Sequence, residues 1–167
     1  TGTEVDAARA VSLLTDLSEQ QHADATYWLG DCFNNGLGVP RDAHEATRLW
    51  LKAATLGHEL SRARAGKQFI EGVGAPQDTK TGVQLLRQAA RSGNTKAQLW
   101  LANYLYAGVH IDKDFKEAAE WAKKAADAGD AVAQCRYGTL LSQGKGVPQD
   151  HKGALAYYLK AANQGLA

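Results

Sequence analysis

A block of sequence recurs four times in this chain at a constant interval. The pair Ala53-Ala54 is followed by three further Ala-Ala pairs, each 36 residues after the last, and the glycine that follows each pair keeps the same interval. A fixed period of about 20 to 50 residues is typical of solenoids, in which each structural unit stacks on its neighbours. The chain, residues 1–167, is therefore predicted to be a single elongated repeat domain. The later pairs are Ala89-Ala90, Ala125-Ala126 and Ala161-Ala162, and the glycines are Gly57, Gly93, Gly129 and Gly165.

Each repeated unit has the sequence pattern of a helical hairpin. Apolar residues recur with the spacing of one helix face in residues 23–35 and again in residues 43–56. The connector GLGVPRD at residues 36–42 supplies glycines that permit positive φ, a proline that stops the first helix, and Asp42 to cap the second. Glu45, three residues after Asp42, is expected to complete a capping box. An all-α structure made of helix-turn-helix units follows from this pattern.

The repeated pattern also resembles a known family. It reads A-x-x-x-L-G-x-x-Y-x-x-G-x-G-V-x-x-D, followed by an alanine, an aromatic residue, the Ala-Ala pair and glycine. This pattern is similar to that of the Sel1-like repeat (SLR) family, a relative of the tetratricopeptide repeat. The resemblance implies a right-handed α-solenoid with repeats at residues 25–60, 61–96, 97–132 and 133–167. The second repeat departs from the pattern at Ser61, Ala65 and Gly82, and the third departs at Ala102 and His110, where a left-handed turn residue is expected.

The two ends of the array differ from its middle. Residues 5–20 share the apolar spacing of a second helix, so they are predicted to form a leading helix that either caps the first repeat or belongs to an upstream unit. After the fourth repeat no capping helix follows, so an open packing face is expected there, to be covered by more chain or by a second copy. The chain begins at Thr1 and contains no Met, which indicates a processed or excised piece.

Composition disfavours several classes of partner. The 19 basic and 18 acidic residues nearly cancel, so no general field attracts nucleic acid or an anionic membrane surface. No apolar run approaches the length of a membrane-spanning helix. Cys32 and Cys135 lie three repeats apart and are predicted to be free thiols. The five histidines are scattered without metal-ligand spacing, so neither a metal nor a cofactor is expected.

Enzyme motifs are present only as fragments. Ser142 to Lys145 matches S-x-x-K, and residues 80–82 match K-T-G, two of the three motifs of penicillin-recognising enzymes. Their order is reversed, the S-D-N motif is missing, and the glycines involved occupy repeat positions. A non-catalytic protein is therefore predicted, with a hydrolase acting through Ser142 as the least favoured alternative.

The resemblance implies that the first helix of each repeat lines a concave groove. Non-core positions of these helices would then face a bound protein or peptide. One column alternates aromatic and basic residues, as Trp28, Arg64, Trp100 and Arg136. These side chains either anchor a partner or form a cation–π ladder, in which each arginine stacks on neighbouring indoles and braces the array. The predicted partner-binding residues are Tyr27, Trp28, Asp31, Asn34, Asn35, Arg64, Lys67, Glu71, Trp100, Asn103, Tyr106 and Arg136.

The sequence thus favours a scaffold or adaptor that binds another protein on its concave face. The resemblance implies bacterial roles in regulation, envelope assembly or toxin immunity, in the periplasm or the cytoplasm. The alternative is a self-associating module whose C-terminal repeat pairs with a second copy to form a homodimer. The residues expected on that open face are Tyr137, Leu140, Leu141, Tyr157 and Leu166.

Overall fold

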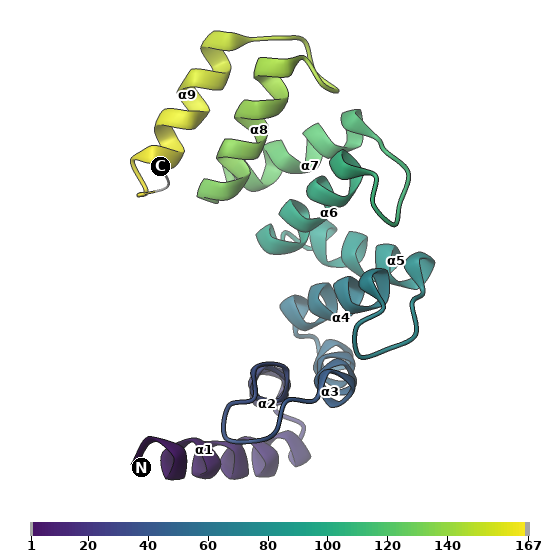
Figure 1. Ribbon diagram of the computed structural model, residues 1–167, viewed down its shortest axis with the longest axis vertical. Coiled ribbons are helices and arrows are strands. Elements are labelled where there is room, and N and C mark those ends of the chain that lie inside the picture. The colour runs from purple at the N-terminus through teal and green to yellow at the C-terminus, as the bar shows by residue number, and fades with distance from the viewer. Residues whose placement is uncertain (1, 166–167) are drawn as a thin grey trace. The chain divides into compact units, whose positions relative to one another are not determined.

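A computed structural model describes the backbone of residues 2–165 and the side chains of residues 6–165. All regular structure in this part of the chain is helical, which confirms the all-α prediction, and most helices are 13 residues long (Figure 1). The helices are α1 (Gly2–Glu19), α2 (Ala23–Asn35), α3 (Ala43–Thr55), α4 (Glu59–Glu71), α5 (Thr79–Arg91), α6 (Thr95–Ala107), α7 (Phe115–Asp127), α8 (Ala131–Gln143) and α9 (His151–Ala162).

The chain divides into two compact units, Thr1–Gln88 and Ala89–Ala167, and the boundary falls within α5. In the first unit, α1 packs on α2, α2 on α3, and α3 on α4. In the second unit, α6 packs on α7, α7 on α8, and α8 on α9. The paired helices α2 and α3, and likewise α8 and α9, lie side by side in Figure 1. Each unit is described by itself below.

The second helix of each hairpin begins at the predicted aspartate. The Asp42 carboxylate accepts a hydrogen bond from the Glu45 amide at 3.0 Å. The reciprocal half of the expected capping box is wrong, because the Asp42 amide donates to the Phe33 carbonyl at 2.9 Å and the Glu45 carboxylate binds Arg48. The bond to Phe33 ties the start of α3 to the end of α2. The hairpin turn is therefore closed by its own backbone.

Two turn glycines lie directly against the preceding second helix. Gly74 and Gly146 have φ of +70° and +73°. A Cβ at Gly74 would meet the Ala43 carbonyl, and one at Gly146 would meet the Phe115 carbonyl. The left-handed backbone favours glycine here, and the close approach leaves no room for a Cβ at these two positions. His110 stands at the same position in the third repeat with φ of +67°, which confirms the predicted left-handed residue.

The core of each unit consists of small residues and a few large ones. In the first unit Trp50 is buried against Tyr27, Ala46, Ala53 and Ala65. Gly30 allows this packing, since a Cβ there would lie 2.8 Å from the Trp50 indole. In the second unit the buried residues include Leu101, Leu140, Ala125 and Trp121. Trp50 and Trp121 both serve packing, since they are only 1% and 8% exposed.

Candidate interaction surface

In the first unit, neighbouring aromatic residues of α2 have opposite environments. Trp28 is 55% exposed and touches the Tyr27 ring edge-on, at 5.0 Å between centroids. Tyr27 is only 4% exposed and Asp31 only 9%. The reason is α4 and its N-cap residue, because the N-cap His58 stacks on the Tyr27 ring at 4.5 Å and Arg64 of α4 reaches Asp31. The prediction that Tyr27 and Asp31 face a partner is therefore wrong.

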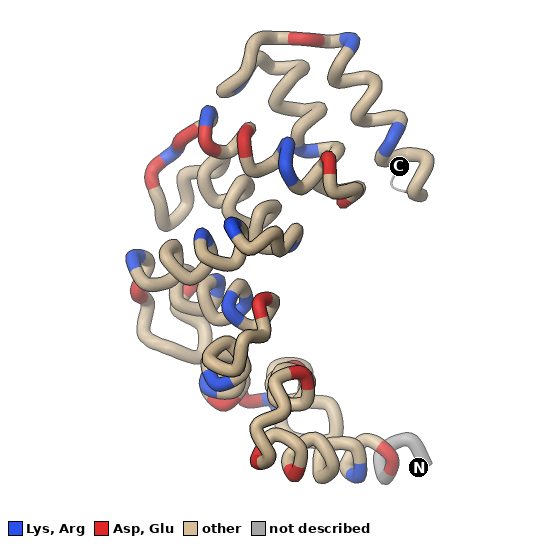
Figure 2. Tube along the Cα trace, turned by 180° about the vertical axis from the view of Figure 1, so that it is seen from behind, with Lys and Arg blue, Asp and Glu red and all other residues tan. Residues whose placement is uncertain are grey.

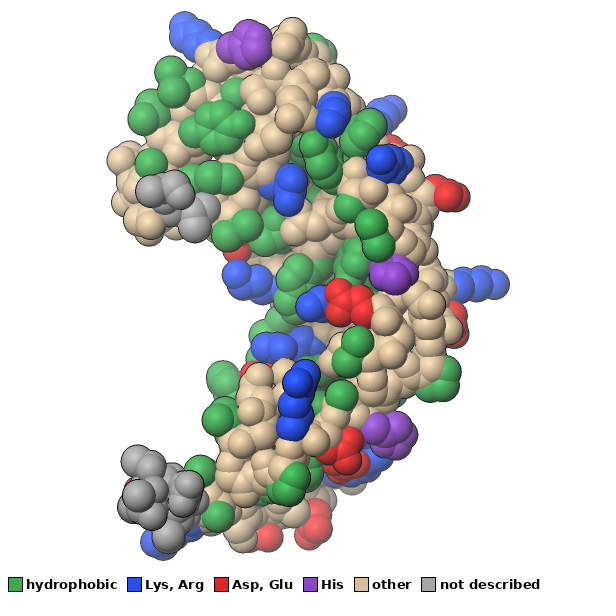
Figure 3. Space-filling view, viewed as in Figure 1, with side chains coloured by type: hydrophobic (Ala, Val, Ile, Leu, Met, Phe, Trp, Pro, Cys, Tyr) green, Lys and Arg blue, Asp and Glu red, His purple; other side chains and the backbone are tan. Residues whose placement is uncertain are grey.

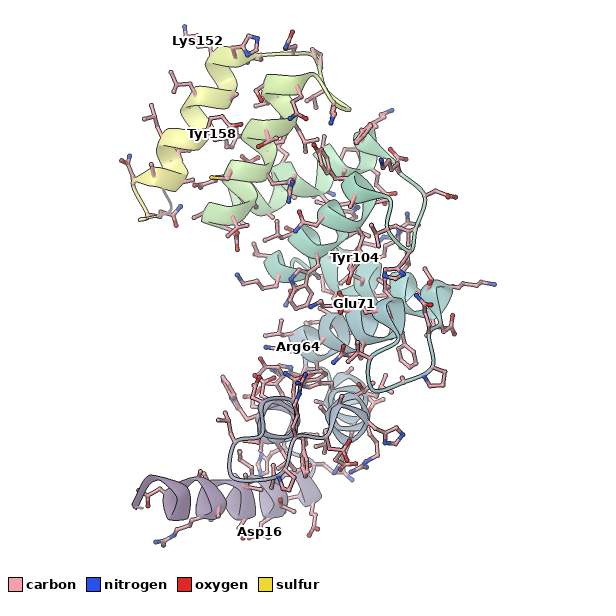
Figure 4. All side chains as sticks on the ribbon, viewed as in Figure 1. Asp16, Arg64, Glu71, Tyr104, Lys152 and Tyr158 are labelled. Carbon is pink, nitrogen blue, oxygen red and sulfur yellow. The ribbon has the colours of Figure 1, made fainter. Side chains whose placement is uncertain are left out.

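Arg64 connects α4 to α2 and α3. Its guanidinium lies 5.6 Å from the centroid of Tyr27 and 5.1 Å from that of Trp50, and it pairs with the Asp31 carboxylate at 3.4 Å. Figure 4 shows Arg64 directed from α4 toward the neighbouring hairpin. The Tyr27 hydroxyl donates to the same carboxylate at 3.2 Å, and burial raises the pKa of Tyr27. Arg64 thus braces the first unit, and its charge is neutralised there.

The remaining predicted residues of the first unit are polar and lie on α2 and α4, the helices that carry Trp28 and Arg64. The Asn34 amide donates to the Asn35 side-chain oxygen at 3.1 Å. Lys67 pairs with Glu71 at 3.7 Å along α4. All four side chains are at least partly exposed. Partly exposed polar residues of this kind are typical of the rim of a protein interface.

In the second unit, α6 and α8 bring a different set together. Asn103, Tyr106 and Arg136 are all partly exposed, as is Trp100. Arg136 donates from Nε to the Asn103 side-chain oxygen at 2.7 Å, and its guanidinium lies 5.1 Å from the Tyr106 centroid. Asn103, Tyr106 and Arg136 therefore form one cluster of amide, aromatic and guanidinium groups, and Trp100 lies one turn before Asn103 on α6.

The two arginines of the predicted column lie over aromatic rings within their own units, but these rings are not the tryptophans of that column. Arg64 lies over Tyr27 and Trp50, and Arg136 lies over Tyr106. In both units the guanidinium group therefore contacts rings other than Trp28 and Trp100, the indoles on which it was expected to stack. Trp28 is consequently left exposed as the largest apolar side chain on the first helices of its unit.

The sequence reasoning missed Lys145, which lies in the turn after α8. Its ammonium nitrogen lies 3.1 Å from the Tyr106 hydroxyl oxygen and 4.9 Å from the ring centroid. A signal was available, because the equivalent residues of the other repeats are the exposed apolar Leu37, Val73 and Val109. A lysine in this apolar column marks the fourth repeat as different.

A hollow beside Arg136 was also missed. It measures about 240 Å³ and is lined by Val132, Cys135, Arg136 and Thr139. These residues recur at i, i+3, i+4 and i+7, so they occupy one face of α8. Val132 is 45% exposed, and the Cys135 thiol is free, as is that of Cys32. The hollow thus combines the apolar Val132 and the Cys135 thiol with a hydroxyl group and the Arg136 guanidinium.

The C-terminal repeat exposes other residues than those predicted for a pairing face. Tyr137, Leu140 and Leu141 are buried within the second unit because α9 packs on α8, so their prediction as an open face is wrong. Tyr157 is partly buried and donates to Asp127, while Leu166 lies outside the described residues. The exposed leucines of α9 are Leu155 (57%) and Leu159 (55%). Figure 3 shows hydrophobic side chains gathered over this part of the unit.

The fragments of enzyme motifs do not come together as a catalytic pair. The Ser142 hydroxyl donates to the Thr139 carbonyl at 2.9 Å, whereas Lys145 is directed to Tyr106. Among the residues whose side chains are described, no three His, Cys, Asp or Glu residues are placed to hold a metal ion. None of the described helices is long and apolar enough to cross a membrane.

Comparison with known proteins supplies the family. The model of the Sel1 repeat matches residues 23–58, 63–94, 95–130 and 131–166. The structure is similar to that of c5321, a protective antigen of uropathogenic Escherichia coli with an SLR fold, at 31% identity and a TM-score of 0.83 over 97% of this chain. It is also similar to a Sel1 repeat protein from Oxalobacter formigenes, at 29% identity and a TM-score of 0.82 over 96% of this chain.

A third similar structure is that of the immunity protein Pa5087 from Pseudomonas aeruginosa, at 25% identity and a TM-score of 0.65 over 95% of this chain. The chain spans 35%, 64% and 59% of the length of these three proteins. Proteins built from Sel1 repeats are generally non-catalytic scaffolds that mediate protein–protein interaction. With all four of its repeats matched and its solenoid structure shared, this chain belongs to the Sel1 repeat family.

Proposed function

We propose that this protein is a non-catalytic adaptor that binds a partner protein through exposed residues of its first helices, which are α2 and α4 in the first unit and α6 and α8 in the second. The observation that carries the proposal is Trp28, which is 55% exposed while its neighbour Tyr27 is covered. Binding energy at interfaces is concentrated in a few residues, of which tryptophan is among the most frequent. Trp100 occupies the equivalent position two repeats later and is partly exposed.

Among adaptor roles, we infer that of a bacterial regulatory, envelope or immunity protein. The likeness to an immunity protein from Pseudomonas aeruginosa over 95% of this chain supports the last of these. An immunity protein acts by binding its cognate toxin, so the surface proposed here would contact a protein. The E. coli and Oxalobacter relatives support a bacterial setting.

Replacing Trp28 and Trp100 together by alanine is expected to weaken partner binding at least thirtyfold, since the loss of even one interface tryptophan that contributes about 2 kcal/mol has this effect. The measurement is a pull-down from a lysate of the source organism with mass-spectrometric identification, followed by titration of the captured protein. Leu13→Ala is the matched control, because Leu13 is 57% exposed but lies on α1. Equal capture by wild type and the double variant would place the binding surface elsewhere.

A second candidate function is self-association through α9, which the exposed pair Leu155 and Leu159 favours. The two leucines are four residues apart and so share one helix face. If this face pairs, sedimentation should show a concentration-dependent dimer that Leu155→Glu/Leu159→Glu converts to a monomer. Leu13→Glu, with similar exposure on α1, should leave the dimer intact. A wild-type protein that stays monomeric at all concentrations would exclude this function.

A further inference from the structure

Two cations of the second unit share one aromatic ring. The Arg136 guanidinium lies 5.1 Å and the Lys145 ammonium 4.9 Å from the centroid of Tyr106. Within the part of the chain whose side chains are described, neither has a carboxylate within 4 Å, whereas other basic residues such as Arg62 and Lys123 pair with acidic neighbours. Two like charges on one ring without a counter-ion repel each other, so this arrangement has an electrostatic cost.

The chain contains its own comparison for Arg136. Arg64 occupies the equivalent position two repeats earlier and reaches back to Asp31, at the position that Asn103 occupies in the second unit. The contact is the same, but its acceptor is a carboxylate in the first unit and a neutral amide in the second. An amide holds the guanidinium in place without cancelling its charge. Arg136 is thus positioned as Arg64 is, yet its charge stays available.

The surroundings strengthen this local positive potential. Neither α6 nor α8 contains an Asp or Glu residue. The acidic residues between them in sequence lie on α7 and in the turns (Figure 2). Asp130, just before α8, already caps that helix and pairs with Lys96 at 3.2 Å. An incoming anion would therefore meet no nearby carboxylate on these two helices.

The cations are also held in position before any ligand arrives. The Tyr106 hydroxyl donates to the Gln143 side-chain oxygen at 3.1 Å and accepts from Lys145 at the same distance. Phe115 packs edge-on against Tyr106 at 5.5 Å, and the Lys145 ammonium lies 5.3 Å from its ring. Long basic side chains normally lose rotamer entropy on binding, and fixing them beforehand reduces this cost.

We propose that the second unit binds an acidic segment of a partner protein, with carboxylates at Arg136 and Lys145 and an apolar side chain in the hollow of about 240 Å³ beside Arg136. This inference rests on the proposed function and names the chemistry of the partner. Charge complementarity selects a protein segment over nucleic acid, because the chain as a whole carries a net charge of only +1 and the positive region is confined to one site, beside the hollow that Val132 and Cys135 help to line.

The test is selection from a random library of displayed dodecapeptides on the immobilised protein. Peptides retained by the wild type should be enriched in Asp and Glu around an apolar residue. The binding of the best peptide should weaken at high salt and be insensitive to an oligothymidylate competitor. Arg136→Gln and Lys145→Gln should each reduce its affinity about tenfold or more, as expected for a lost charge-assisted hydrogen bond.

The sharpest variant is Asn103→Asp, which copies the Arg64–Asp31 pair into the second unit. It should keep the fold, as checked by circular dichroism and thermal unfolding, while abolishing the enrichment of acidic peptides. Arg62→Gln, at a cation already paired with Glu59, is the control that should change nothing.

The outcomes separate the two proposals. Retained peptides without acidic enrichment, or acidic peptides that bind wild type and Asn103→Asp equally, would overturn this inference and leave the adaptor function standing. Displacement by the oligothymidylate would also overturn it, in favour of a nucleic-acid site. Failure to retain any peptide would contradict both proposals.

Discussion

Replacing Trp50 by alanine is expected to lower the free energy of unfolding by about 3–5 kcal/mol, the usual cost of removing a large buried aromatic side chain. Trp50 is 1% exposed and packs on Tyr27, Ala46 and Ala53. The neighbours cannot close the resulting cavity easily, because most of them are alanines or backbone. Arg64 would also lose the ring on which its guanidinium lies.

Trp28→Ala is the matched control for this experiment. It removes the same side chain from the same unit, but Trp28 is 55% exposed and packs chiefly on the edge of Tyr27. Exposed substitutions of this kind usually change stability by about 0.5 kcal/mol or less. Urea unfolding followed by circular dichroism measures both variants. Equal losses for Trp28→Ala and Trp50→Ala would show that burial does not distinguish the two tryptophans.

Much of the fold could be predicted because its signals are local and repeated. The aspartate that begins α3 and the glycines with positive φ act within a few residues of their position, so a short stretch of sequence is enough to predict these features. Repetition adds certainty, since His110 could be assigned a left-handed backbone only from the glycines at its position in other repeats. The reciprocal capping bond of Asp42 was mispredicted, because its amide finds a carbonyl across the turn.

The candidate site was less predictable because its contacts cross between repeats. Helical spacing places Tyr27 and Trp28 near one another on α2, but it does not show that His58 and Arg64 of the next hairpin cover only Tyr27. The rings that Arg64 and Arg136 contact were unpredictable for the same reason, because these rings and the arginines lie on different helices. Lys145 could have been found, because it interrupts a column of apolar turn residues.

The second large effect is expected for Gly146→Ala. Gly146 has φ of +73°, and a Cβ at this position would collide with the backbone of Phe115 and Lys116. A left-handed alanine costs about 1–2 kcal/mol, and forcing two backbone segments apart adds about 1–3 kcal/mol. The substitution should therefore destabilise the second unit by about 2–5 kcal/mol, as measured by chemical unfolding.

Gly129→Ala separates the two contributions, because Gly129 has φ of +95° in the same unit but no atom within 4 Å of the added Cβ. Gly129→Ala should therefore lower the free energy of unfolding by only about 1–2 kcal/mol, the cost of a left-handed alanine. If the two variants unfold alike, the contact between the turn and Phe115 contributes nothing to stability. A larger loss at Gly146 would show that this contact holds the fourth repeat on the third. Since Phe115 also packs on Tyr106 and lies beside the Lys145 ammonium, that loss should be accompanied by weaker binding of acidic peptides.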